Sequence, residues 1–355
     1  MKVFKKILLV IGIVLVALIA VFVGYIIFSS VTTLKVEDTK ELEISNSINE
    51  SISKDGTFKI LSWNIGYGSL DEKQDCYLDG GVNMIGESKE KVNENVNAIM
   101  DFISSNNPDI FFIQEIDIKS KRSYKVNELD MFMNKFTTYE SSYACNFKAG
   151  FVPIPLYSPM GRVEAGITTF TRFNMTAAAR IQLPIPFSWP MSLLNLKRCL
   201  LINRLPIEGS DKELVLINLH LEAYDDGEGK AKQLKQLMDI IDDEMEKGNY
   251  VIAGGDFNQT FSADYLIKYP KMNDWVCPII DTDAYSDVSF FMDDTYPTCR
   301  SLNKPYYNSD KETHQYYMID GFIVSSNIEV SSMNTIDLGF KNTDHNPIIM
   351  NFKFK

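Results

Sequence analysis

Six short segments carry polar side chains where an apolar, strand-like run ends or is interrupted. A carboxylate, an amide or an imidazole occupies each of these places. The segments are SWNIG (62–66), IQEID (113–117), INLHLEA (217–223), AGGDFNQT (253–260), MIDGF (318–322) and TDHNPI (343–348). Side chains that follow neighbouring strands can converge at one edge of a sheet. We therefore interpret the six segments as parts of a single site.

The residue types in these segments suit hydrolysis at a magnesium ion. Magnesium prefers a few hard carboxylate oxygens and leaves room for water and a substrate phosphate. Glu115, Asp256 and Asp344 offer such oxygens, and Asn64 and Asn258 offer neutral amides. Each feature alone has a plainer interpretation, because Glu115 could be a solvated strand end and 256–258 could form an Asx turn.

Two histidines extend this chemistry. His345 directly follows Asp344 and can take up or release a proton near neutral pH. Asp320 interrupts an apolar strand, where a carboxylate costs free energy unless it is paired. His220 ends another strand, and on its position alone a hydrogen-bonded core imidazole is an equal alternative to a functional one.

From residue 57 onward, segments typical of strands and helices alternate. Apolar spacing predicts helices over 87–105 and 231–245, each with a single apolar stripe. Apolar runs predict strands at 58–64, 110–113, 213–221, 250–254 and 317–325. This alternation is typical of an α/β or α+β architecture. Because no linker-like stretch interrupts it, we expect one large domain over 57–355.

The N-terminus differs from this block. Residues 1–6 carry three lysines, and residues 7–28 form an apolar run without a charge. About 20 helical residues cross a hydrocarbon core, so 7–28 is predicted to be a transmembrane anchor in the cell membrane. The lysines predict a cytoplasmic N-terminus and an extracytoplasmic domain. Cleavage as a signal peptide, which would secrete the domain, is the alternative. Residues 29–56 are polar and are predicted to form a stalk.

Composition excludes several classes of protein. The chain has 355 residues, of which 45% are hydrophobic and 23% charged, and its net charge is -12. It is therefore neither disordered nor a polytopic membrane protein. The acidic balance argues against nucleic-acid binding through a basic surface. The five cysteines form no CxxC pair, which disfavours a zinc ribbon.

The motifs WNIG, QEID, NLH, GGDFN, MIDGFIVS and TDHNPI, in this order, resemble the endonuclease/exonuclease/phosphatase superfamily. The resemblance covers about residues 58–354. It implies a four-layer sandwich of two mixed β-sheets flanked by helices. It also implies hydrolysis of phosphate esters with Mg²⁺ as the cofactor and Mn²⁺ as the alternative ion.

The resemblance also assigns roles residue by residue. Asn64 and Glu115 correspond to the metal-proximal pair, with Glu115 as the principal ligand, and Asp344 to a carboxylate beside the metal or the phosphate. Asp256 and Asn258 correspond to the pair that positions the water and the phosphate. His345 corresponds to the essential histidine, and Asp320 to the carboxylate that orients it.

Three further assignments concern the substrate. His220 matches a second histidine that contacts phosphate and helps to protonate the leaving group, and Glu164 lies where a glutamate can pair with it. Arg122, in a cluster of basic residues at 119–125, could hold a substrate phosphate, although a solvated loop is the plainer interpretation.

Two apolar, proline-punctuated stretches, 151–157 and 183–191, bear on the substrate class. Such loops could rest on a membrane interface, or they could pack beneath the sheet edges. The predicted transmembrane anchor and the acidic net charge favour a lipid or a small phosphorylated molecule as the substrate. An extracellular endonuclease and a non-catalytic binding module of the same fold remain alternatives. The sequence indicates no protein partner.

Overall fold

Two seven-stranded sheets pack face to face in the computed structural model, which describes residues 2–225, 227–269, 271–272, 275–307 and 311–355. In spatial order, the first sheet contains β1 (Thr39–Glu41), β7 (Ala177–Gln182), β8 (Cys199–Pro206), β9 (Glu213–His220), β10 (Tyr250–Asp256), β14 (Asp320–Ser325) and β11 (Val288–Phe291). The second contains β15 (Ile328–Thr335), β16 (Ile348–Phe354), β3 (Phe58–Asn64), β4 (Ile110–Asp117), β6 (Gly161–Thr171), β5 (Glu140–Val152) and β2 (Ile44–Ser45).

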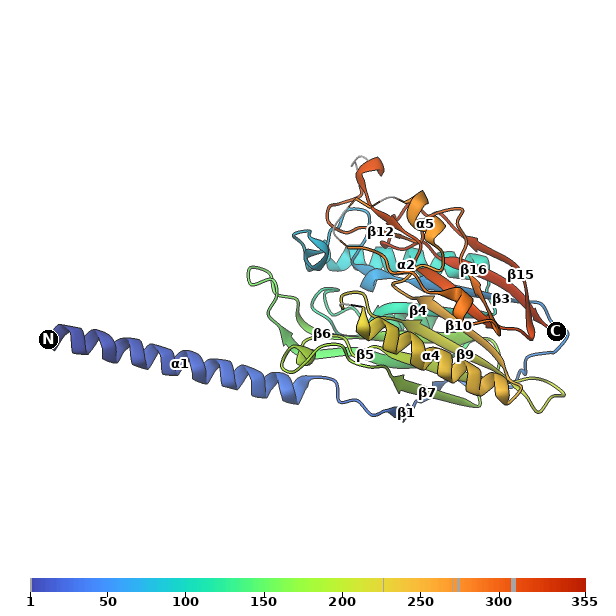
Figure 1. Ribbon diagram of the computed structural model, residues 1–355, viewed down its shortest axis with the longest axis horizontal. Coiled ribbons are helices and arrows are strands. Elements are labelled where there is room, and N and C mark those ends of the chain that lie inside the picture. Colours follow the sequence, from blue (N-terminus) through green and yellow to red (C-terminus); the bar gives the residue numbers. More distant parts are fainter. Residues whose placement is uncertain (1, 226, 270, 273–274, 308–310) are drawn as a thin grey trace.

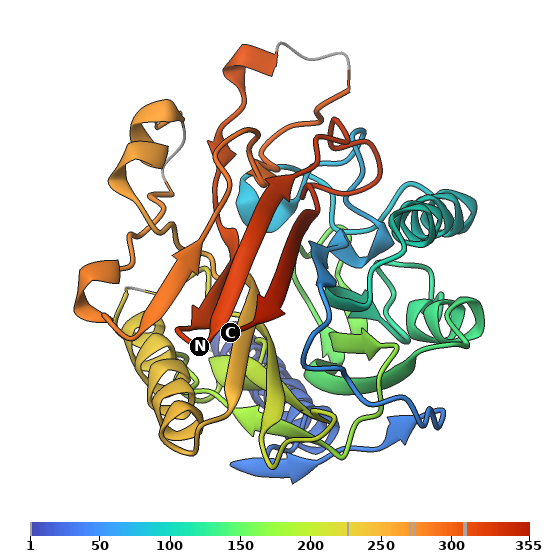
Figure 2. The same cartoon turned by 90° about the vertical axis from the view of Figure 1, so that its right-hand side faces the viewer.

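Helices cover the outer faces of both sheets. Apolar side chains of α2 (Lys89–Asn106) and α3 (Glu128–Lys135) pack on the second sheet, and those of α4 (Glu228–Glu246) pack on the first. Figure 2 shows α4 in yellow on one side of the strands and α2 and α3 in teal on the other. The predicted four-layer sandwich is confirmed.

The core explains why the strands are apolar. Side chains of β3, β4, β9, β10 and β16 meet in a buried cluster between the two sheets. Because opposite faces of β3 and β10 pack against the partner sheet and the helices, these strands are buried along nearly their whole length. The predicted helix at 87–105 begins slightly later, because the Ser88 hydroxyl caps it by accepting a hydrogen bond from the Lys91 backbone N–H.

Short elements occupy the connections. They include the helix α5 (Ala263–Lys268), the strand pair β12 (Cys299–Arg300) and β13 (Tyr316–Tyr317), and 3₁₀ turns at η1 (Gly66–Gly68), η2 (Tyr77–Asp79), η3 (Met191–Leu193), η4 (Thr282–Ala284) and η5 (Lys311–Thr313).

Strand direction gathers the predicted site residues. β3 runs parallel to β4, and β9 runs parallel to β10, with Asp256 in register with His220. The antiparallel strand β14 begins where β10 ends, so that Asp320 pairs with Asp256. Chain segments far apart in the sequence therefore present their polar residues at one end of the sandwich.

The N-terminal region departs from the predicted organisation. The helix α1 spans Lys2–Thr32, and it is long and apolar enough to cross a membrane. The helix therefore includes residues 2–6 of the segment that was predicted to be cytoplasmic. Met1 lies outside the described residues. Figure 1 shows α1 projecting from the domain.

Residues 29–56 do not form the predicted free stalk. β1 adds to β7 at the edge of the first sheet, and β2 adds to β5 at the edge of the second. Ile52 is completely buried within the core between the sheets. The prediction is wrong because backbone pairing with distant sheet edges, rather than an apolar side-chain pattern, holds β1 and β2 in place.

Candidate active site

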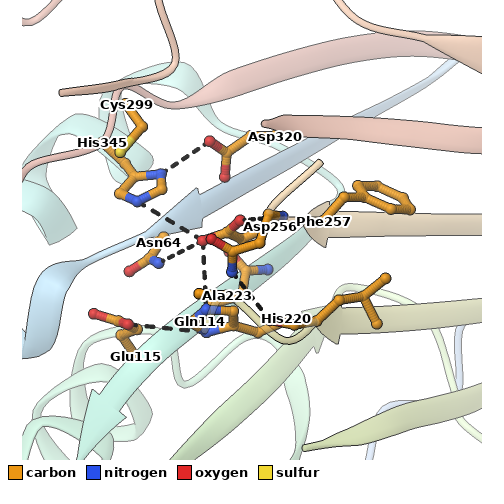
Figure 3. Close-up of polar contacts among 12 residues, drawn as sticks. Asn64, Gln114, Glu115, His220, Ala223, Asp256, Phe257, Cys299, Asp320 and His345 are labelled. Atoms are coloured by element: carbon orange, nitrogen blue, oxygen red, sulfur yellow. Dashed lines mark hydrogen bonds and ion pairs between the residues drawn. The ribbon is translucent and has the colours of Figure 1, made fainter. Parts of the chain in front are cut away.

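Eight of the ten predicted site residues line a cleft of about 850 Å³ at the end of the sandwich. Asn64, Glu115, Arg122, His220, Asp256, Asn258, Asp344 and His345 all contribute to its wall. In Figure 3, His345 lies between Asp320 and Asp256, and His220 lies between Asp256 and Glu115. One cleft therefore joins residues from both sheets.

His345 is held by carboxylates on two sides. Its Nδ1 lies 2.9 Å from Asp320 Oδ2, and its Nε2 lies 3.7 Å from Asp256 Oδ2 and 3.9 Å from Asp344 Oδ2. Burial by itself lowers the pKa of His345, but Cys299 and Asp320 raise it, and the pKa lies well above its ordinary value. Burial raises the pKa of the Cys299 thiol to about 12, so Asp320 is the charged partner. The contact with Asp320 therefore favours the protonated form of the imidazole.

Asp256 contacts several polar residues of the site. Its Oδ2 accepts a hydrogen bond from Asn64 Nδ2 at 3.1 Å, and its Oδ1 accepts one from the backbone N–H of Asn258 at 2.9 Å. His220 Nε2 lies 3.4 Å from Oδ2. Burial, followed by the neighbouring Asp320, raises the pKa of Asp256 to about 6. This carboxylate is therefore suited to accept a proton near neutral pH.

Glu115 occupies an irregularity in β4. The pairing of β4 with β6 shifts register between Ile113 and Ile116, and Glu115 has a φ of 57°, in the left-handed region. Such bulges redirect side chains and are common beside active sites. Burial and the nearby Asp344 raise the pKa of Glu115 to about 8. Glu115 and Asp344 thus bring two acidic groups to the same cleft.

These residues fit a divalent cation. Asn64 Oδ1 accepts one hydrogen bond, from the Gly66 backbone N–H at 3.1 Å, which leaves one lone pair on this oxygen. Glu115, Asp344 and Asn64 therefore form an all-oxygen donor set of the kind that Mg²⁺ or Mn²⁺ takes. Among the described residues, the groups in which three His, Cys or acidic ligand atoms lie within 4.8 Å of one another are Cys299, Asp344 and His345, and Asp256, Asp320 and His345. Both include His345, and the protonated imidazole that Asp320 favours is a poor metal ligand.

His220 differs from His345 in its charge. Burial, Arg198 and His345 lower the pKa of His220 well below its ordinary value, so its imidazole is neutral. Its Nδ1 lies 3.9 Å from Glu115 Oε1 and has no hydrogen-bond partner, although it is buried. A satisfied core imidazole, the plainer interpretation of this residue, is therefore wrong.

Sequence comparison identifies the family of the chain. The model of the Endonuclease/Exonuclease/phosphatase family matches residues 61–313. The chain belongs to this family. No curated protein sequence matches the chain.

Solved structures share the family fold at low sequence identity. An endonuclease/exonuclease/phosphatase from Beutenbergia cavernae is 14% identical, with a TM-score of 0.57, over 84% of this chain and 72% of that one. The human Nocturnin catalytic domain with a bound sulfate is 16% identical, with a TM-score of 0.54, over 88% and 97%. D. rerio TDP2, solved with a single-stranded DNA product, is 17% identical, with a TM-score of 0.52, over 84% and 100%.

One predicted residue of this family member lies elsewhere. The Glu164 carboxylate on β6 binds Lys148 Nζ at 2.6 Å and Arg162 Nη2 at 2.9 Å. Its predicted pairing with His220 is wrong, because residues two apart on a strand share a face, and Glu164 therefore lies beside Arg162. The carboxylate that approaches His220 Nδ1 is Glu115.

Arg122 is buried rather than part of a solvated loop. Its Nε and Nη2 donate to the two carboxylate oxygens of Asp117 at 3.1 and 3.0 Å. The guanidinium carbon lies 3.2 Å from the centre of the Tyr67 ring. The side chain lines the cleft, but Asp117 already neutralises its charge. Arg122 is therefore a fixed part of the wall, positioned by two strong contacts.

Arg198, which our sequence analysis missed, is the less satisfied cation of the cleft. It is 4% exposed, and its Nε lies 3.7 Å from Glu222 Oε2, beyond hydrogen-bond distance. Its Nε and Nη1 have no hydrogen-bond partner. The available sequence signal was a basic pair, Lys197–Arg198, directly before the apolar strand β8. Buried unpaired N–H groups in a cleft are suited to bind an anion.

Proposed function

We propose that this protein is a divalent-metal-dependent phosphodiesterase or phosphatase, tethered to the cell membrane by α1 with its catalytic domain on the extracytoplasmic side. Family membership implies hydrolysis of phosphate esters as the reaction class. The observation that carries the proposal is the chain of contacts from Asp320 through His345 to Asp256, opposite the carboxylates of Glu115 and Asp344.

The chemistry follows from the charges of these residues. Asp256, held by Asn64 and Asn258, accepts the proton of a water molecule that attacks phosphorus. The His345 cation, fixed by Asp320, stabilises the negative charge that develops on the phosphoryl oxygens. His220 has its Nδ1 without a partner and is available to bind a phosphate oxygen or the leaving oxygen.

The metal would be held by Glu115 and Asp344, with Asn64 as a neutral ligand. A bound Mg²⁺ or Mn²⁺ supplies positive charge that stabilises the crowded phosphate. Burial and the neighbouring Asp344 raise the pKa of Glu115, so these two acidic residues are suited to share a bound cation. We infer Mg²⁺ as the resident ion because the three donor atoms are all oxygens.

Retention of α1 is supported by the contacts of its last turn. Ser29 is buried, and Thr33, which follows the helix, accepts a hydrogen bond from Lys197 Nζ at 2.5 Å. Leu34 donates its backbone N–H to the Lys148 carbonyl of β5 at 3.0 Å. Cleavage near the end of α1 would expose these surfaces. We therefore propose an uncleaved single-pass anchor with its N-terminus in the cytoplasm.

The substrate we favour is a lipid or a small phosphorylated molecule. The net charge of -12 opposes a long polyanion such as DNA. An extracellular endonuclease is the second candidate, because the related fold of D. rerio TDP2 was solved with a single-stranded DNA product. A non-catalytic module of the same fold would need the buried unpaired groups of Arg198 and His220 for binding alone.

The test uses the full chain in detergent and in phosphatidylcholine vesicles. Bis(p-nitrophenyl) phosphate, a phosphomonoester, phospholipid and sphingolipid vesicles and plasmid DNA are assayed with Mg²⁺, Mn²⁺ and EDTA. We expect metal-dependent release of product from a phosphate ester. Cleavage of DNA with a steep dependence on salt would favour the endonuclease. Absence of hydrolysis from every substrate would contradict the enzymatic proposal.

A further inference from the structure

The end of α1 is fixed to the catalytic domain. Tyr25 Oη donates a hydrogen bond to the Phe151 carbonyl at 3.0 Å, and Thr32 Oγ1 accepts one from the Gly150 backbone N–H at 3.2 Å. The contact is so close that a Cβ at Gly150 would lie 2.5 Å from Thr32 Oγ1. Because β5 and α1 are joined in this way, the direction of α1 sets the orientation of the whole domain.

The connection between β5 and β6 points along α1 toward the membrane. Contacts along β5 at Lys148, Gly150 and Phe151 are made to Leu34, Thr32 and Tyr25 in turn. Later residues of β5 thus contact earlier residues of the segment that includes the apolar helix α1. Residues 153–160, which follow β5, therefore continue from the end of the domain that contacts α1. Figure 1 shows α1 leaving the domain at the end where β5 and β6 are joined.

Apolar side chains are exposed on this connection and on two neighbouring segments. We call them the apolar tips: Leu156 (88% exposed), Tyr157 (68%), Trp189 (66%), Val82 (62%), Leu78 (52%) and Met191 (51%). Tyr157 Oη donates to the Val82 carbonyl at 2.6 Å, and the Tyr77 and Tyr157 rings meet edge to face. Two of the three segments therefore form one connected surface.

The same segments form the wall of the active-site cleft. Leu78 is both an apolar tip and a lining residue, and Met160 and Leu196 line the cleft from the ends of the other two segments. Across the mouth, Tyr224 Oη donates to Asp79 Oδ1 at 2.6 Å. The surface that carries the apolar tips is therefore continuous with the cleft.

We propose that the apolar tips dock into the outer leaflet of the bilayer that α1 enters, so that the cleft takes its phosphate ester from the membrane surface. This inference rests on the proposed function and narrows its substrate to a phospholipid headgroup. The apolar tips lie at the end of the domain from which the apolar helix α1 projects. We therefore infer that they contact the lipid bilayer rather than a second protein. Exposed Leu, Trp and Tyr side chains are the types that enter the interfacial region of a bilayer.

Fluorescence quenching tests the docking without relying on catalysis. The full chain is reconstituted in phosphatidylcholine vesicles whose acyl chains carry bromine near the headgroup, and insertion of α1 is verified by flotation in alkaline carbonate. We expect brominated lipid to quench tryptophan emission at least ~1.5-fold. Trp189→Phe should abolish this quenching, whereas Trp275→Phe should preserve it. Undiminished quenching in Trp189→Phe, or none in the inserted wild type, would overturn the docking.

Hydrolysis tests the consequence for the substrate. Leu156→Glu combined with Trp189→Glu should lower hydrolysis of vesicle phosphatidylcholine ~10-fold relative to hydrolysis of soluble bis(p-nitrophenyl) phosphate. Ile267→Glu is the matched control, because Ile267 is 78% exposed but lies on α5, far from the tips. An equal fall for both substrates would contradict the lipid assignment. Absence of both activities in the wild type would contradict the proposed function, and quenching would still decide the docking.

Discussion

The two sides of the cleft differ in how completely their polar groups are satisfied. On one side, His345 Nδ1 lies 2.9 Å from Asp320 Oδ2, and both carboxylate oxygens of Asp256 accept hydrogen bonds in the protein alone. On the other side, Arg198 and His220 keep buried nitrogen atoms without hydrogen-bond partners. Buried polar groups are normally satisfied, so the second side indicates where a ligand must bind.

This difference separates the two roles of the site. The complete side is preorganised, because its residues hold one another in place before any substrate arrives. The incomplete side carries buried nitrogen atoms that a phosphate would satisfy, and burial together with the nearby Asp344 raises the pKa of Glu115. We infer that the first side performs the proton transfer and that the second binds the metal and the substrate anion.

The largest expected effect follows from breaking the complete side. Asp256→Ala or His345→Ala should lower metal-dependent turnover of bis(p-nitrophenyl) phosphate by at least ~10²-fold. Each variant removes a group that acts on the transition state, so kcat should fall more than KM rises. Asp239→Asn, an exposed carboxylate on α4, is the control and should retain full activity. Near-normal turnover in both alanine variants would contradict the assignment.

A smaller effect is expected where the metal binds. Glu115→Gln keeps the size of the side chain but removes its charge, so the concentration of Mg²⁺ needed for half-maximal activity should rise ~10-fold or more. Activity at saturating Mg²⁺ should recover in part. Titration of activity with Mg²⁺ measures both values. An unchanged Mg²⁺ requirement would show that Glu115 is not a ligand.

The unsatisfied arginine should act mainly on substrate binding. Arg198→Gln should raise the KM for a phosphodiester ~10-fold, because a charged hydrogen bond to the phosphate is lost. Arg122→Gln should instead lower the thermal stability of the fold, since it leaves Asp117 buried without its partner. Steady-state kinetics and thermal unfolding of the two variants distinguish these roles. Equal effects of the two substitutions on KM would remove the distinction.

The complete side of the site was predictable from the sequence. Asn64 and Asp256 end β3 and β10, whereas Asp320 begins β14 and His345 precedes β16. Such strand ends gather at one edge of a sheet. The motif order then gave the family and the four-layer fold, which the family match confirms.

The incomplete side was not predictable in the same way. The role of Arg198 depends on its lack of a hydrogen-bond partner. Only the fold shows that Glu222 Oε2 lies 3.7 Å from Arg198 Nε, beyond hydrogen-bond distance. Glu164 was misplaced, although its pairing with Arg162 follows from strand alternation. The stalk was misjudged because β1, with all three residues exposed, has no apolar pattern to reveal its pairing with β7.

The smallest expected effect is the dependence of stability on pH. Glu115 has its pKa raised to about 8 in the folded protein, so the folded state binds a proton that the unfolded state releases between about pH 4.5 and 8. Its contribution to stability is therefore present below this window and is lost as the pH rises through about 8.

In EDTA, the Tm advantage of Glu115→Gln over wild type should therefore grow from pH 5.5 to pH 8.5, by a few degrees at ~2 °C per kcal/mol. Glutamine does not titrate, so the variant removes the pH dependence of stability that Glu115 contributes. It leaves the histidines in place. Saturating Mg²⁺ at pH 8.5 should shrink the difference, because only wild type gains the full binding free energy of the metal. A pH-independent difference would show that Glu115 is not forced to carry a proton by burial and Asp344, and the contrast between the two sides of the cleft would then rest on Arg198 and His220 alone.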